Sequence, residues 1–143
     1  MAMASVVIEQ AEPWRECNEH EGAITIRLAG VELVGRAVLA SAAEWEALAS
    51  APGAGRRADV SLERTGVVDQ LATAAPPSLL RQGGTIYELV GMVLNAGDDA
   101  LIVEGPIDLR VDLSTPPGQP RPAMRLGATV RIVGELLIEL EDG

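Results

Sequence analysis

The chain has 143 residues and 48% hydrophobic composition, which exclude wholesale disorder and suit a single domain over residues 1–143 with a sizeable core. No apolar run approaches the roughly 20 residues of a membrane-spanning helix. The N-terminal sequence Met-Ala-Met-Ala-Ser has no basic region before an apolar segment, unlike a signal peptide. A single cysteine, Cys17, excludes an intramolecular disulfide framework. We therefore expect a cytoplasmic protein without a membrane segment.

The net charge of −10 restricts the choice of partners. All 11 basic residues are Arg, and the chain has no Lys. Such an excess of acidic groups repels nucleic acid and anionic membranes and favours a basic partner. The aromatic residues are only Trp14, Trp45 and Tyr87, so we expect a core of aliphatic side chains.

The first 40 residues predict three strands. Residues 5–10 are rich in β-branched residues, and residues 23–28 alternate apolar and polar side chains. Ala29-Gly30 separates the second run from a third, at 31–39. Because Gly can supply the positive φ of a tight turn, we expect a hairpin here.

The best helix signal comes directly after these strands. Ser41-Ala-Ala-Glu44 is a capping box, in which the Ser side chain accepts from the Glu44 amide and Glu44 reaches back to the Ser41 amide. A short helix is therefore predicted over about 41–50, with Trp45 and Leu48 on its apolar face.

The central region has weaker patterns. Residues 56–64 form a strand candidate, with Val60 and Leu62 on one side. Between Val67 and Gly84, Asp69 could cap a short helical turn and residues 78–82 could form another. Pro76-Pro77 prevents a long helix.

The stretch from Thr85 to Leu140 most clearly predicts β-sheet. Runs at 85–95 and 100–103 are apolar and β-branched, and residues 107–113 alternate strictly between apolar and charged. A Pro-rich loop precedes a final run at 128–140. The predicted fold class is thus mostly β, a single-domain barrel or strongly curved antiparallel sheet with one short helix.

The C-terminal half resembles an OB-fold barrel at the level of the fold. A long strand leads into a β-ribbon, and its mid-strand Gly91 fits a bulge that lets a barrel turn its corner. The sequence from Leu126 to Gly134 is similar to a later strand of such barrels. The resemblance covers about residues 85–140, and residues 1–84 would elaborate a barrel at 85–143. Glu32-Leu-Val-Gly35 recurs at 88–91, a match that chance explains in so Leu-, Val- and Gly-rich a chain.

An OB-like barrel implies a possible site for single-stranded nucleic acid, which such barrels bind with stacking rings in a positive groove. The candidates are one aromatic residue and four cations: Tyr87, Arg110, Arg121, Arg125 and Arg131. The net charge and the shortage of rings argue against this interpretation, which remains an alternative.

A second alternative is a small enzyme or metal protein. Cys17 and His20, the only thiol and the only imidazole, lie three residues apart among acidic residues. Zinc usually takes three or four protein ligands, and no second Cys/His pair exists, so a solvated acidic loop is the simpler interpretation. We expect no metal and no other cofactor.

The leading functional prediction is a non-catalytic, acidic interaction protein. It would bind a protein partner, expected to be basic, or assemble with itself. An inhibitor or immunity-like partner of a basic protein is one concrete version.

Overall fold

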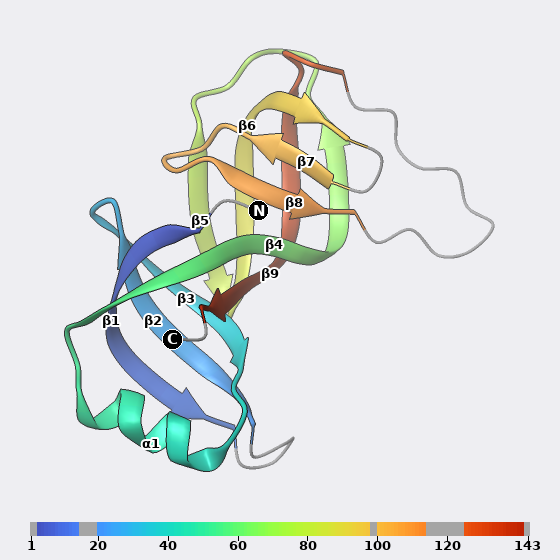
Figure 1. Cartoon of the computed structure of the whole chain (residues 1–143). Coiled ribbons are helices and arrows are strands. Elements are labelled where there is room, and N and C mark those ends of the chain that lie inside the picture. Colours follow the sequence, from blue (N-terminus) through green and yellow to red (C-terminus); the bar gives the residue numbers. More distant parts are fainter. Residues whose placement is uncertain (1–2, 15–19, 98–99, 114–124, 142–143) are drawn as a thin grey trace. The chain divides into compact units, whose positions relative to one another are not determined.

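The computed structural model describes residues 3–14, 20–97, 100–113 and 125–141, and for 64–67 it describes the backbone alone. Most of these residues are in strands, and one short helix is present, so the predicted fold class is confirmed. The elements shown in Figure 1 are β1 (Ala4–Pro13), β2 (Glu21–Leu28), β3 (Val31–Val38), α1 (Ala42–Ser50), β4 (Ala54–Gln70), β5 (Ser78–Gly83), β6 (Ile86–Ala96), β7 (Ala100–Val103), β8 (Leu109–Asp112) and β9 (Thr129–Leu140).

The chain divides into two compact units. The first unit takes the described residues up to Val60 and those from Leu136 onward, and the second takes the described residues from Ser61 to Glu135. The long strands β4 and β9 therefore each give one segment to each unit.

The strands of the first unit form a closed ring. β1 pairs antiparallel with β2 along one edge and with β4 along the other, and β2 pairs antiparallel with β3. β3 is parallel to β9. The ring closes between β9 and β4, where the Glu141 amide donates to the Arg57 carbonyl at 2.9 Å. Aliphatic side chains with exposed fractions of 0–2% fill its interior, among them Val6, Ile8, Ile24, Ile26, Leu33 and Ile138.

The hairpin between β2 and β3 is confirmed. Leu28 is paired with Val31, so the turn has two residues, Ala29 and Gly30. Both have positive φ, at 49° and 81°. Such turns match the right-handed twist of the flanking strands.

Helix α1 begins as the capping box predicts, with one difference. The Ser41 hydroxyl accepts from the Glu44 amide at 3.3 Å, while the Glu44 carboxylate accepts from the amide of Ala40 rather than from that of Ser41. Trp45 is 1% exposed, and its ring nitrogen donates to the His20 carbonyl at 2.9 Å. This bond ties the helix to the start of β2.

The second unit contains another closed ring. β6 pairs antiparallel with β9 along its first part and with β7 along its last, and β7 pairs antiparallel with β8. β8 is parallel to β4, with Ser61 opposite Arg110. The Leu71 amide donates to the Thr129 carbonyl at 2.8 Å, where β4 meets β9. β5 adds a further strand beside β6 (Figure 1).

Gly91 has a different role from the one predicted. The register irregularity of β6 lies between Val93 and Asn95, not at the glycine. A Cβ at Gly91 would instead overlap the carbonyl of Glu104, so only glycine permits this close approach of two backbone segments.

Two predictions for the central region are wrong. β4 continues as a strand to Gln70, so Asp69 caps no helical turn, and residues 78–83 form β5 instead of a turn of helix. Leu79 lies opposite the fully buried Leu89 of β6. Pairing with the adjoining strand β6 thus outweighs a weak local pattern in β5.

The recurring sequence Glu-Leu-Val-Gly does not mark equivalent strands. Glu32–Gly35 lies in β3, which follows β2 in its ring, whereas 88–91 lies in β6, the first strand of the β6–β7–β8 meander.

We expect Ser41→Ala to lower the free energy of unfolding by about 0.5–2 kcal/mol, because an amide at the start of α1 loses its side-chain acceptor. Urea denaturation measures the effect. Ser41→Asp, which retains an acceptor, should keep the wild-type midpoint, and an unchanged midpoint in Ser41→Ala would contradict the role of the cap.

Candidate functional site

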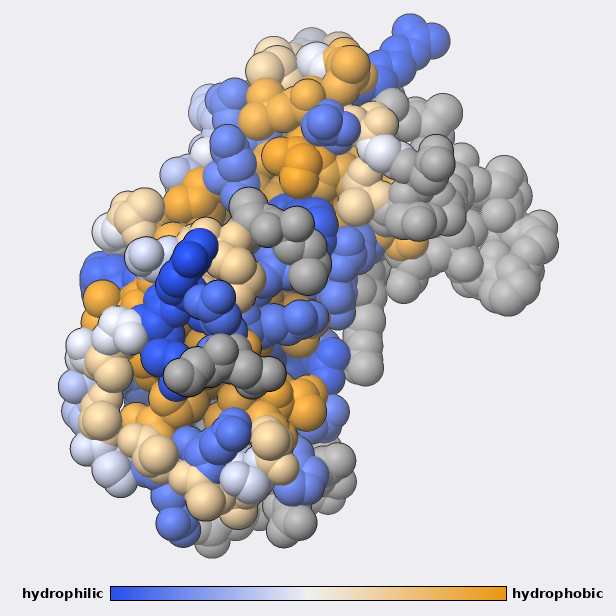
Figure 2. All heavy atoms as spheres, viewed as in Figure 1, coloured by the Kyte–Doolittle hydropathy of each residue, from blue (hydrophilic) through white to orange (hydrophobic). Residues whose placement is uncertain are grey.

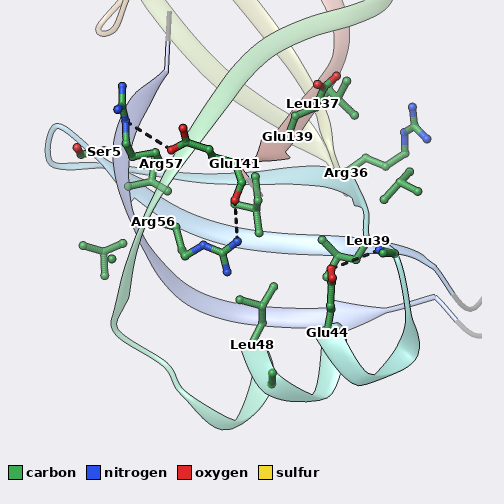
Figure 3. Close-up of a pocket in the computed structure, with 17 residues that line it drawn as sticks. Ser5, Arg36, Leu39, Glu44, Leu48, Arg56, Arg57, Leu137, Glu139 and Glu141 are labelled. Carbon is green, nitrogen blue, oxygen red and sulfur yellow. Dashed lines mark hydrogen bonds and ion pairs between the residues drawn. The ribbon is translucent and has the colours of Figure 1, made fainter. Parts of the chain in front are cut away.

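The first unit has a surface hollow where β3 and β9 separate. The two strands share one residue pair, Arg36 with Leu137, and the chain then leaves β3 for α1. The hollow has a volume of about 1160 Å³ (Figure 3). It is lined by the start of β1 (Ser5, Val6, Val7), the end of β3 and the segment between β3 and α1 (Arg36, Val38, Leu39, Ala40), α1 (Glu44, Ala47, Leu48), the start of β4 (Gly55, Arg56, Arg57) and the end of the chain (Leu137, Glu139, Leu140, Glu141).

Aliphatic side chains make up much of this lining. Val6, Leu48 and Leu137 are buried, whereas Val7 and Val38 are 41% and 57% exposed. In Figure 2, the face of this unit turned to the viewer mixes hydrophobic and hydrophilic surface. Two exposed valines beside a buried apolar floor offer contact area to a partner.

The charged groups of the hollow are only partly compensated. The Arg36 guanidinium pairs with Glu21 at 3.2 Å, and that of Arg57 lies 3.8 Å from the Glu141 carboxylate. Arg56 donates to the main-chain carbonyl of Glu141 at 3.0 Å (Figure 3). In the described part of the chain, Arg56, Glu44 and Glu139 form no ion pair, so the hollow presents one such cation and two such anions.

The hollow has few groups that could act as a nucleophile. Among the described residues that line the hollow, Ser5 has the only hydroxyl, and no His or Cys is present. A nucleophile needs a base within hydrogen-bond reach, and Ser5 has no hydrogen bond to a carboxylate or imidazole among these residues.

The predicted nucleic-acid residues that the structure describes all lie in the second unit. Tyr87 is 3% exposed, so its ring is not available for stacking against a base. Arg110 pairs with Asp112 at 3.1 Å, and Arg131 bridges Glu88 and Asp69 at 3.0 and 3.3 Å. Arg125 is exposed, and Arg121 lies outside the described residues.

The predicted metal candidates are described only in part, since Cys17 lies outside the described residues. The His20 carbonyl accepts from the Trp45 ring nitrogen and from the Leu39 amide. This residue therefore links the start of β2 to α1 and to the segment between β3 and α1. Within the described ranges, no three His, Cys, Asp or Glu residues are grouped so as to hold a metal ion.

Sequence reasoning missed the hollow, because its lining comes from four separate stretches of the chain, within 5–7, 36–48, 55–57 and 137–141. The available signal was the pair of outward-facing valines, Val7 and Val38, at positions where polar residues alternate with buried ones.

Comparison with known proteins assigns no relationship: no family model, no curated protein and no solved structure matches the chain. Among the described residues α1 is the one helix, and with 9 residues it is too short to cross a membrane.

We expect the purified protein to contain no stoichiometric zinc, because Cys17 and His20 have no second Cys/His pair to complete a site. Elemental analysis by mass spectrometry tests this. Zinc at one equivalent, lost in a Cys17→Ser/His20→Ala double variant, would establish the metal-protein alternative.

Proposed function

We propose that the protein is a non-catalytic interaction protein that binds a basic protein through the hollow of the first unit. The observation that carries this proposal is the pair of exposed valines, Val7 and Val38, in a hollow with a buried apolar floor. The net charge of −10 supports the basic nature of the partner.

The contact would combine burial with charge pairing. Covering Val7 and Val38 contributes about 25 cal/mol for each Å² of apolar surface removed from water. A Lys or Arg of the partner would reach Glu139, and an acidic group would reach Arg56. The net charge adds long-range attraction, which raises the association rate and falls with salt.

The acidic composition favours one biological form of this binding, an inhibitor or immunity-like protein that occupies a basic protein in the cytoplasm. Electrostatic attraction at long range gives such pairs fast association.

We expect tagged wild-type protein to capture a basic protein from an extract of the source cell, and Val38→Glu to reduce capture by tenfold or more. The substitution puts a charge where an apolar contact is expected, at an exposed position that folding tolerates. Leu126→Glu is the matched control, because Leu126 is 68% exposed in the second unit. Raising salt from about 50 to about 300 mM should weaken capture, since the Debye length shortens.

Parallel samples treated with nuclease separate direct capture from capture through nucleic acid. Equal capture by wild type and Val38→Glu would exclude the hollow as the binding surface. Capture that disappears with nuclease would exclude a direct protein partner.

A second candidate function rests on the order of the strands. Around the ring of the first unit, the strands lie in the order β1, β2, β3, β9 and β4, which are the first, second, third, fifth and fourth of that unit along the chain. Helix α1 lies between the third and the fourth. The second unit repeats this order with β6, β7, β8, β4 and β9. We infer that both rings are OB-fold barrels, the second completed by β4 from earlier in the chain. OB-folds often bind oligonucleotides.

Although this strand order is that of oligonucleotide-binding barrels, we expect the protein not to bind labelled single-stranded DNA or RNA at moderate salt in fluorescence anisotropy. Tyr87 is buried, and Arg110 and Arg131 are paired with carboxylates, so few groups can stack or release counterions. Micromolar binding that is lost in an Arg125→Ala/Arg131→Ala variant would favour the oligonucleotide-binding function instead.

A further inference from the structure

Strand β5 of the second unit has an open edge. Among the strands of the described residues, it alone has a single partner strand, β6. No main-chain hydrogen bond joins its other edge to a described residue. An open edge presents unpaired amides and carbonyls, which an extended strand of another molecule can satisfy.

The side chains of β5 do little to block such pairing. Leu80 is 57% exposed, and the residues after it up to Gly83 are exposed as well. Edge strands are usually protected by several charges, by Pro within the strand or by an inward-pointing charge. β5 contains one charge, Arg81, whose Nε donates to the Gly84 carbonyl at 2.7 Å. Pro76-Pro77 precedes the strand, and its one register irregularity lies at its end, between Arg81 and Gly83.

We propose that β5 is a self-association edge, at which two copies of the chain pair antiparallel through β5, with Leu80 of each copy opposite Leu80 of the other. A two-fold axis at this position places Arg81 opposite Leu79 and Ser78 opposite Gln82. No like charges then lie directly opposite each other, and the exposed leucines cover one another.

The charges beside β5 permit this pairing. Leu80 lies opposite Glu88 on β6, and the Glu88 carboxylate is paired with Arg131 at 3.0 Å. In the paired edges, the two Glu88 residues would be separated by three strand spacings, about 14 Å, which exceeds the Debye length of about 8 Å at physiological ionic strength.

A second copy carries the same net charge, so salt has the opposite effect to that expected for a basic partner. Screening weakens the mutual repulsion of two chains of −10, and self-association through β5 should strengthen with salt. The edge lies in the second unit and does not involve the hollow, so this inference stands apart from the proposed function.

The test is the solution mass of the wild type and of single variants at Leu80, by sedimentation or by light scattering after gel filtration at about 0.15 M and about 0.5 M salt. We expect the wild type to form a dimer, more stable at the higher salt. Leu80→Glu and Leu80→Lys should each weaken dimerisation at least tenfold, because like charges would lie opposite each other. Circular dichroism should show that both variants retain the wild-type fold, since Leu80 is exposed.

Mixing the two variants gives the decisive measurement. An equimolar mixture should restore the dimer as a heterodimer, because the introduced carboxylate and ammonium groups then face each other across the axis. Leu126→Glu and Leu126→Lys, at an exposed position outside β5, should keep the wild-type mass. A monomeric wild type, a dimer unaffected by either Leu80 variant, or a mixture that stays monomeric would each overturn the proposal.

Discussion

The pairing of β4 with β9 is the constraint on which both units depend. Glu141 bonds to Arg57 in the first unit, and Leu71 bonds to Thr129 in the second. Without this pairing, each ring would be open between β4 and β9. The neighbouring parallel contacts are short, because β3 pairs with β9 through one residue pair and β8 pairs with β4 through two. An open ring exposes unpaired backbone groups on two edges, whereas a closed ring removes them. Two strands, each divided between two units, therefore provide the closure of both.

The elements that a few neighbouring residues determine could be predicted from the sequence. The turn at Ala29-Gly30 needs two residues of positive φ, and the start of α1 needs an acceptor at Ser41, so both could be read from a few neighbouring residues. Strands with clear alternation, such as β2 and β8, were equally accessible. The prediction failed in the central region, where the last part of β4 and all of β5 have weak patterns. The end of β4 lies beside β9, which is distant in the sequence, and β5 is a strand because it pairs with the adjoining β6.

The candidate sites were harder to predict than the fold, for a related reason. The hollow gathers side chains from both ends of the chain and from its middle, so no short motif marks it. Tyr87 and Arg131 illustrate the converse. Their residue types fit nucleic-acid recognition, but Tyr87 lies on the inner face of β6 and Arg131 is held by two carboxylates. Residue type indicates what a side chain can do, and the face of the strand decides whether it is available.

The residues that carry the proposals share one departure from the pattern of a barrel strand. A strand with one face on the core is expected to place polar groups on the other, as β2 does with Thr25 and Arg27. β6 instead places Ile86, Met92 and Leu94 outward, at 38–40% exposure, and Leu80 of β5, which lies opposite Glu88, is exposed as well. Aliphatic groups in water contribute nothing to the stability of the isolated chain, but they contribute to association once a partner covers them. In both proposals the contact residues are therefore outward-facing aliphatic groups, which neither a motif nor the core would reveal.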